Sequence, residues 1–437
     1  MNSLIDRDVV CIDRRLRTID TEGIARNMKV MQRSNRKLSM ENLLKSIIAL
    51  SANGTIRLER IASYAKLVLG VNYSKQAVNK RIKEGFDRFI LTVAAQLFSA
   101  DAVNTRVPAG AFQGFSRILI QDSTNISLPE RYKNIYPGSS NQNGSTAGLK
   151  IQLVMDLLAG SIAHFSLSGF TRNDQSAARD ILEVAGPGDL VLRDLGYFVL
   201  ETFSEMIRRG IYFISRYSHK VSICDPETHR LLDLEKMVDK ENTLDTCVLL
   251  GAKRLVPVRL IAVPVHIKVA DERRRKAKQD RDKRLHPSKK RLYLMGWDIY
   301  VTNVDNDQWT PAQAQSIYWL RWKIEIIFKA WKSHLEIAGL NTASEALLNT
   351  SIAAKLVFCI ITHKIHQSLE MLAPQKKHVS IIRVAKLISE CATLFASIIL
   401  NVPPDKLLAH LIENHVYYEQ RKDRRNMQEA VEHLLLG

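Results

Sequence analysis

Four side chains between residues 311 and 335 have types and spacings that could act on a phosphate: Tyr318, Arg321, Glu325 and Lys332. On one helix, at about 100° per residue, they project to about 0°, 300°, 340° and 320°, a stripe about 60° wide. The carboxylate could ligate a metal ion while arginine, lysine and tyrosine hold a nearby phosphate. The alternative is that these residues only stabilise the helix, since Arg321 and Glu325 form a favourable i,i+4 ion pair.

Two aspartates upstream favour the chemical interpretation. Asp122 follows the run Arg117–Gln121, and Asp194 follows Leu190–Arg193. Aspartate is disfavoured inside strands, so we expect both at strand ends, where side chains of neighbouring strands can converge. Together with Glu325 they would form an all-oxygen site for Mg²⁺ or Mn²⁺. Such a site suits two-metal phosphoryl transfer, although single strand-end aspartates usually only form turns.

The first hundred residues must supply helices. The segment Leu58–Leu69 has helical periodicity, Gly70–Tyr73 interrupts it, and Ser74 is a suitable N-cap for a helix over Lys75–Phe89. This pattern predicts a helix-turn-helix whose second helix contacts the phosphates and base edges of DNA. The polar residues of that helix are Lys75, Gln76, Asn79, Lys80 and Arg81. The alternative is a helical hairpin with a solvated basic face.

From Arg117 onward the pattern changes to short apolar or alternating runs separated by turn residues, which predicts an α/β domain with a mixed sheet. The strands are expected at 118–120, 150–158, 162–167 and 189–193, with helices at 174–183 and 200–209. A second set of strands is expected at 211–216, 246–250, 255–265 and 292–302. A charge run at 271–291 reads as a solvated helix or loop, and one long helix is expected from Pro311 to about Leu335. The remainder, to Gly437, is expected to be helical, with a break at Pro403–Pro404.

Composition narrows the class of partner. Hydrophobic content of 46% and charged content of 25% are those of an ordinary folded protein, but the net charge is +18. This surplus favours a nucleic-acid partner. The alternative, an anionic membrane surface, lacks a basic amphipathic helix to support it. The length fits two to four domains of roughly 150 residues each.

Apolar segments, cysteines and motifs indicate where the protein acts and whether it uses a nucleotide cofactor. Met1–Arg17 mixes acids and bases, so we expect no signal peptide. The most apolar stretches, 353–362 and 396–402, are well short of the ~20 residues that span a bilayer and are expected to be buried helices, without membrane association. Five scattered cysteines indicate a reducing compartment, the cytoplasm. No phosphate-binding glycine loop supports a nucleotide cofactor.

The four residues of the stripe resemble a known signature in both type and spacing. They read Tyr318-x₂-Arg321-x₃-Glu325-x₆-Lys332, and the Y-(2)-R-(3)-E-(6)-K signature belongs to the insertion-sequence-four family of DDE transposases. Asp122-Ser123-Thr124 is similar to the family's first acidic motif, and Leu192–Tyr197 to its second. The segments 136–150 and 321–332 most resemble the branch first known from Bacillus insertion elements. The resemblance covers residues 115–340 well.

The resemblance implies an α/β fold with a ribonuclease-H-like core, a β-rich insertion domain and flanking helical regions. The implied domains are 1–105 for DNA binding, 106–210 and 292–340 for the core, 211–291 for the insertion and 341–437 for dimerisation. The long interval between Asp194 and Glu325 fits such an insertion.

The resemblance also implies the roles of single residues. Asp122, Asp194 and Glu325 would be the catalytic triad, binding two Mg²⁺ or Mn²⁺ ions, and Tyr318, Arg321 and Lys332 would grip DNA near the cleaved phosphate. Trp297 matches a position that stacks a flipped base during hairpin formation in some members, or else it packs at a strand edge. Arg216, and less clearly Lys150, match DNA contacts.

The implied activity is metal-dependent cleavage at the terminal inverted repeats of an insertion sequence and strand transfer into target DNA. This cut-and-paste reaction could pass through a hairpin. Double-stranded DNA would be the partner, both as transposon ends and as target, and a homodimer would synapse two ends near the bacterial nucleoid. Two alternatives remain: a structure-specific nuclease on the same core, and an inactive DNA-binding regulator.

Overall fold

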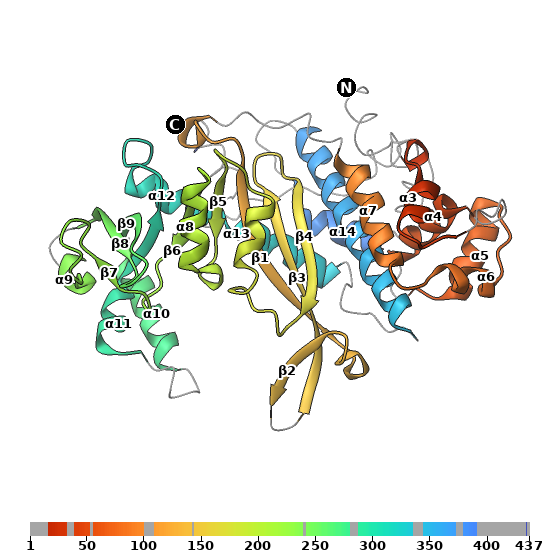
Figure 1. Cartoon of the computed structure of the whole chain (residues 1–437), viewed down its shortest axis with the longest axis horizontal. Helices are drawn as coiled ribbons and strands as arrows, with labels where there is room; N and C mark the ends of the chain where they lie inside the picture. The colour runs from red at the N-terminus through yellow and green to blue at the C-terminus, as the bar shows by residue number, and fades with distance from the viewer. Residues whose placement is uncertain are drawn as a thin grey trace.

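One large sheet lies at the centre of the molecule, with helices on its faces and at its ends (Figure 1). The computed structural model describes residues 16–32, 39–52, 56–99, 109–141, 144–238, 242–279, 287–334, 344–372, 379–390 and 434. Among these residues the chain forms a mixed α/β fold, as the sequence predicts. The apolar stretch 396–402 and the break at 403–404 lie outside the described residues.

The sheet has ten strands in the order β2-β3-β1-β5-β6-β10-β9-β8-β7, with β4 paired to β3. β1 is antiparallel to β3 and parallel to β5, and β5 is parallel to β6. The first strands are β1 (Ile118–Leu128), β2 (Pro137–Asn141), β3 (Gly144–Asp156), β4 (Ile162–Gly169) and β5 (Leu190–Arg193). The others are β6 (Tyr212–Arg216), β7 (Ile223–Cys224), β8 (Leu244–Leu250), β9 (Val256–Pro264) and β10 (Trp297–Thr302).

The first acidic residue does not end its strand, and the prediction that it would was wrong. β1 continues six residues past Asp122, to Leu128, and pairs with β3 along its whole length after Ile118. Beyond Asp122 polar residues alternate with the buried Ile126 and Leu128, a period of two that suits a strand with one solvated face. Pairing with β3 outweighs the low strand propensity of aspartate, which depends strongly on context.

Two buried clusters lie on the two faces of the sheet, because successive side chains of a strand point to opposite faces. Ile118 and Ile120 of β1 belong to one cluster and Leu119 to the other. The first cluster includes α12 (Pro311–Trp319), α13 (Trp322–His334), α14 (Glu345–Leu372) and α15 (Ile381–Glu390). The second includes α8 (Leu200–Arg208) and residues of β6, β8, β9 and β10.

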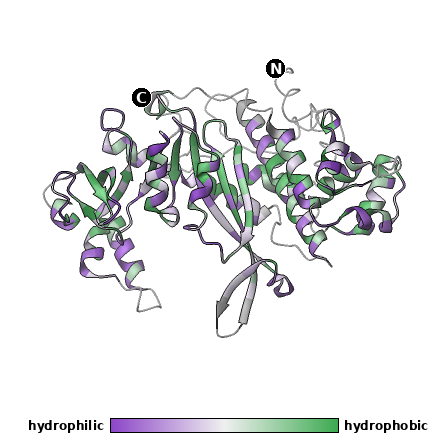
Figure 2. Cartoon of the chain, viewed as in Figure 1, coloured by the Kyte–Doolittle hydropathy of each residue, from purple (hydrophilic) through white to green (hydrophobic). Residues whose placement is uncertain are grey.

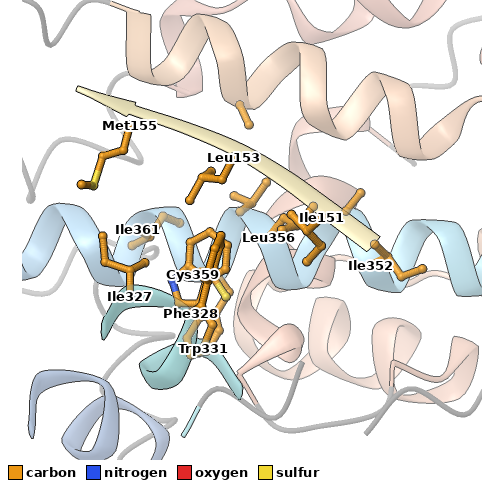
Figure 3. Packing of buried hydrophobic residues seen from close by; sticks show 14 of the residues in the cluster. Ile151, Leu153, Met155, Ile327, Phe328, Trp331, Ile352, Leu356, Cys359 and Ile361 are labelled. Atoms are coloured by element: carbon orange, nitrogen blue, oxygen red, sulfur yellow. The ribbon is translucent and has the colours of Figure 1, made fainter. Parts of the chain in front are cut away.

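Helix α14 is the longest described helix and is buried, with hydrophobic residues concentrated in it and in the central strands (Figure 2). Ile352 and Leu356 of α14 lie near Ile151 of β3, and Cys359 lies beside Phe328 and Trp331 of α13 (Figure 3). Glu345–Gln367 is long and apolar enough to cross a membrane, yet 89% of its most apolar window is buried inside the protein. The expectation of a buried helix around 353–362 is confirmed.

The N-terminal helices are α3 (Thr21–Asn27), α4 (Met40–Ser51), α5 (Leu58–Leu69), α6 (Lys75–Arg81) and α7 (Phe86–Ser99). They lie at one end of the molecule, where α7 and α4 pack against α14 (Figure 1). The N-cap is confirmed, because the Ser74 hydroxyl accepts from the backbone N–H of Ala77. The predicted second helix was too long: Gly85 takes a left-handed conformation (φ 85°), which separates α6 from α7.

The predicted strands over 211–265 form, and they continue the central sheet. Arg259 of β9 donates to Asp245 and to the backbone carbonyls of Asp305 and Trp309, which fixes the chain just before α12. The charge run forms α10 (Ile267–Lys278) and then α11 (Lys289–Leu294), so the expected strand at 292–302 begins only at Trp297. Residues 174–183 form turns and the 3₁₀-helix η4 (Ala178–Glu183) where a full helix was expected.

The long helix expected from Pro311 is two helices. α12 ends at Trp319 and α13 begins at Trp322, and across the junction the N–H groups of Leu320, Arg321 and Lys323 bond three residues back. Such i→i+3 bonds tighten the turn and rotate the side chains that follow. Tyr318 and Glu325 therefore lie on different helices, with Arg321 at the junction.

Candidate active site

The three acids predicted from the sequence lie close together. Gln121 of β1 pairs with Arg193 of β5 in parallel register, so Asp122 and Asp194 follow at corresponding positions on adjacent strands. Glu325 lies in the first turn of α13, which packs against β1. The parallel pairing of β1 and β5 therefore brings together acids that lie far apart in the sequence.

The Arg321 guanidinium lies between the three carboxylates. Its Nη1 donates to Asp122 Oδ2 at 2.8 Å, and its Nη2 donates to Glu325 Oε1 at 2.7 Å. The same Nη2 is 3.7 Å from Asp194 Oδ1. With only 7% of its side chain exposed, Arg321 pairs with these acids out of solvent. Charge-assisted bonds in such surroundings are stronger than on an open surface.

Burial and charge shift the proton affinities at this point. Burial raises the pKa of Asp122 to about 7, against the lowering effect of the Arg321 charge and of the N–H of Ser123. The negative charges of Asp194 and Glu325 raise it further. Burial alone would lower the pKa of Arg321, but Tyr318 and the acids raise it above its ordinary value, so the guanidinium stays charged.

A pocket of about 430 Å³ opens beside Asp122 and Glu325. Its lining residues are Asp122, Ser123, Thr124, Glu325, Phe328, Lys329, Lys332 and Ser333. Lys332 thus lies beside the acids, as the sequence predicted, and burial lowers its pKa. Lys329 was not predicted, although its spacing of one helical turn from Glu325 could have indicated it. The pocket joins carboxylates and ammonium groups in one cavity.

Tyr318 is buried behind the acids, and its hydroxyl has no hydrogen-bond partner among the described residues. Its ring centroid lies 5.0 Å from that of Tyr300 and 5.9 Å from the guanidinium carbon of Arg321. Burial raises the pKa of Tyr318 to about 12. The neighbouring Trp322, which the sequence reasoning missed, is about half exposed and lies 5.6 Å from the Arg321 guanidinium.

A second group of charged residues lies where β6 ends and the antiparallel strand β10 begins. Asp298 Oδ1 accepts from Arg216 at 3.3 Å and from Arg273 of α10 at 2.8 Å, and its Oδ2 accepts from Gln315 of α12 at 3.1 Å. Arg216 pairs in register with Tyr300, which contacts Tyr318. Arg216 therefore lies near Tyr318, and Arg273 of the charge run binds the same carboxylate.

Two predicted residues lie differently. Trp297 is partly buried and packs against the second hydrophobic cluster, on the face of β10 opposite to Asp298. This placement supports the packing alternative. Lys150 is buried, and its ammonium lies 2.8 Å from Asp174 Oδ1, on the face of the sheet that Ser123 faces. Asp174 was missed because it lies in an irregular segment without a motif.

The three carboxylates suit a divalent cation, since they already converge on one positive group. Around that guanidinium, among the residues that the structure describes, no group of three or more histidine, cysteine, aspartate or glutamate side chains is arranged closely enough to hold a metal ion. To hold such an ion, the carboxylates would have to come closer together and Arg321 would have to release them.

Comparisons with known proteins agree with this geometry. Residues 113–361 match the model of the transposase DDE domain. The chain is 31% identical, over 82% of its length and 79% of the relative's, to the transposase for insertion sequence element IS231E of Bacillus thuringiensis subsp. finitimus. It is 27% identical to the transposase for IS1151 of Clostridium perfringens, over 72% of this chain and 71% of that one.

Among solved structures, a piggyBac transposase synaptic complex with hairpin DNA aligns with 97% of this chain and 84% of its own. Its TM-score is 0.44 and its identity 9%, too low to establish a common fold. The family match covers more than half of the chain, and the resemblance to the Bacillus branch is confirmed at about 30% identity. The chain therefore belongs to the DDE transposase family, and it is a DNA transposase that cleaves DNA and transfers the cut strand.

Proposed function

We propose that the chain cuts DNA at the terminal inverted repeats of an insertion sequence and joins the ends to target DNA, with Asp122, Asp194 and Glu325 as the catalytic residues. One observation carries this assignment: three acids from β1, the end of β5 and α13 converge on the Arg321 guanidinium. Three carboxylates around one guanidinium leave an excess of negative charge, which lowers the stability of the folded protein. Such an arrangement is typical of a site that binds a charged ligand.

The three carboxylates would hold Mg²⁺ or Mn²⁺, and two ions suit the reaction. Oxygen ligands of this kind are those that both ions prefer. Bound there, the ions would activate a water or 3′-OH and stabilise the leaving oxygen of an in-line displacement.

The chain's own residues would orient the DNA. Lys332 and Lys329 line the pocket beside the acids and would bind the phosphates on either side of the cleaved bond. Arg321 would turn from the carboxylates toward the phosphate, since its planar fork fits phosphate as well as carboxylate. The Tyr318 hydroxyl would supply a hydrogen bond from the buried side. Arg216, exposed at the end of β6, would bind the backbone further along.

The sheet and its helices support a ribonuclease-H-like core formed by residues 106–210 and 292–340. Asp122 on β1 and Asp194, directly after the parallel strand β5, lie at its centre, and α13 brings Glu325 toward them. Residues 211–291 would be the β-rich insertion, whose strands extend the same sheet beyond β6.

The N-terminal region 1–105 would recognise the terminal repeat. Gln76, Asn79 and Lys80 of α6 are exposed, whereas Lys75 forms an ion pair with Glu59 of α5. Exposed amide and amino groups on a short helix after a turn suit base edges and phosphates in the major groove. Region 341–437 would mediate a homodimer that synapses two ends, and the protein would act in the cytoplasm at the nucleoid.

The test is cleavage of a labelled duplex that carries the element's own terminal repeat, with Mg²⁺ or with EDTA. The full-length chain and Glu325→Gln are compared, with target DNA added in one arm. We expect nicking that needs both metal and Glu325, and a joined product when target is present. Cleavage without joining would identify a structure-specific nuclease, and binding without cleavage would identify a DNA-binding regulator.

A further inference from the structure

Each of the two aspartates is oriented by one backbone N–H group. The N–H of Ser123 donates to Asp122 Oδ1 at 2.7 Å, and the N–H of Gly196 donates to Asp194 Oδ2 at 3.2 Å. A hydrogen bond of this kind limits the directions in which a carboxylate can point. The positions of Ser123 and Gly196 therefore determine how the two acids face each other.

Both of these residues lie next to one carboxylate, that of Asp174. The Ser123 hydroxyl donates to Asp174 Oδ1 at 2.8 Å. Gly196 lies against the other oxygen: a methyl group at Gly196 would be 3.0 Å from Asp174 Oδ2 and 3.2 Å from its Cβ. Asp174 thus connects the strand that carries Asp122 to the turn that carries Asp194.

The position of Asp174 is itself fixed from β3. The Lys150 ammonium is 2.8 Å from Asp174 Oδ1, and the Gln152 amide donates to the same oxygen at 3.2 Å. The Tyr197 hydroxyl donates to the side-chain carbonyl of Gln152, so the residue after Gly196 is held by the same group. Burial favours protonation of Asp174, but the hydrogen bonds from Lys150 and Ser123 keep its pKa below its ordinary value.

We propose that Asp174 is a positioning residue of the transposase, which sets the separation and orientation of Asp122 and Asp194 through Ser123 and Gly196. It lies on the face of the sheet opposite to Arg321, so it would act through the two motifs and would not touch DNA or metal. This inference rests on the proposed function, because it takes Asp122 and Asp194 as metal ligands. Partners of metal ligands typically change metal affinity or activity by about 10–100-fold when they are mutated.

The test compares Asp174→Asn with Asp180→Asn in the full-length chain. Asp180 is the matched control, because it is a partly buried acid of the same segment whose ion pair, 2.6 Å to Arg172, touches neither motif. Mn²⁺ binding is measured by electron paramagnetic resonance, and the Mg²⁺ dependence of nicking is measured on the terminal repeat. For Asp174→Asn we expect both midpoints to rise about tenfold or more, with unchanged binding of the repeat in EDTA.

A second variant removes the concern that Asp174→Asn leaves the buried Lys150 without its counter-ion and unfolds the protein. Gly196→Ala keeps that ion pair and needs no unusual backbone angle, but its methyl group would push against Asp174. We expect it to weaken Mn²⁺ binding in the natural background, and to add little when Asp174 is replaced by the smaller serine. Such non-additivity is the mark of residues that act through one contact.

The outcomes separate this inference from the function on which it rests. If Asp122→Asn loses Mn²⁺ binding while Asp174→Asn and Gly196→Ala both behave like Asp180→Asn, the positioning role is overturned and the triad stands. If Asp122→Asn binds Mn²⁺ like the unmodified chain, the triad assignment itself fails.

Discussion

Arg321 donates a hydrogen bond of 2.8 Å to Asp122, although 199 residues separate them in the sequence. The bond joins the junction of α12 and α13 to the middle of β1. Because the same guanidinium also donates to Glu325, one cation pairs with an acid on β1 and with an acid on α13. Under the proposed function the arginine occupies the position in which a divalent cation would serve the carboxylates, so it would have to move away for the ion to bind.

Arg321→Ala should therefore make the DNA-free protein depend more on divalent cations. Without the guanidinium, Asp122, Asp194 and Glu325 repel one another, and Mg²⁺ would relieve that repulsion. We expect Mg²⁺ to raise the Tm of Arg321→Ala about 1 °C more than that of the unmodified chain, the shift that corresponds to about 1 kcal/mol in a chain of this length. Thermal unfolding with and without Mg²⁺ measures this. Equal shifts in both proteins would contradict the competition between arginine and metal.

Asp122→Asn should abolish cleavage and leave binding of the terminal repeat nearly intact. The amide preserves the shape of the side chain and can still accept from Ser123, but it is a poor ligand for a divalent cation. Nicking and gel-shift assays on the same labelled duplex give the two readouts. Retained nicking would remove Asp122 from the triad, and lost binding would indicate a folding defect.

The residue types and spacing around Glu325 were sufficient to predict the family, because a signature of four polar residues is rarely met by chance. The same pattern could not predict the break at Leu320–Arg321. Apolar periodicity continues through the junction, and only the requirement that Arg321 reach Asp122 on β1 distinguishes one helix from two. That requirement is a tertiary contact, which local sequence does not encode.

Asp122 illustrates a different limit. Aspartate has low intrinsic strand propensity, so the local sequence predicts that the strand ends at Asp122. Pairing of β1 with β3 carries the strand on to Leu128. Asp174 could not be predicted at all, because it lies in a turn and its partners Lys150 and Ser123 come from two different strands. Such residues become visible only when the sheet places them side by side.

Lys332→Ala should weaken binding of the transposon end and reduce its salt dependence. One phosphate contact contributes about 0.9 to the slope of log K against log salt concentration. We expect the slope to fall by about that amount, measured by titration of the labelled end at several salt concentrations. Lys236→Ala is the control, since Lys236 is exposed on α9 (Leu234–Val238), near the β7–β9 end of the molecule (Figure 1). A slope unchanged by Lys332→Ala would make this lysine structural.

Trp297→Ala should lower stability and reduce all steps of the reaction alike. The indole is partly buried against the second hydrophobic cluster, so its removal should cost roughly 2 kcal/mol of unfolding free energy, less than a fully buried tryptophan. Denaturant unfolding and single-step cleavage assays test this, with Trp297→Phe as the milder control. A selective loss of hairpin formation at unchanged stability would instead support stacking on a flipped base.

His363 of α14 connects that helix to the turn between β3 and β4. It is buried, its Nε2 contacts the backbone carbonyl of Gly160, and its Nδ1 has no partner among the described residues. The carbonyl oxygen can only accept, so Nε2 must carry a proton, and in the neutral ring this selects the Nε2–H tautomer. Burial, helped by the charge of His366, lowers the pKa of His363 to about 3.

Stability should consequently fall as the pH drops below 6.5. In that range the unfolded chain binds a proton at His363, whereas the folded protein does not, so acid favours unfolding until the pH nears 3. The maximal slope for one such group is about 1.4 kcal/mol per pH unit. His363→Gln keeps a donor toward Gly160 without titrating. Between pH 7.5 and pH 5.5 its unfolding free energy should therefore fall by about 1.4 kcal/mol less than that of the unmodified chain. A pH dependence identical in both proteins would mean that His363 takes up its proton in the folded state.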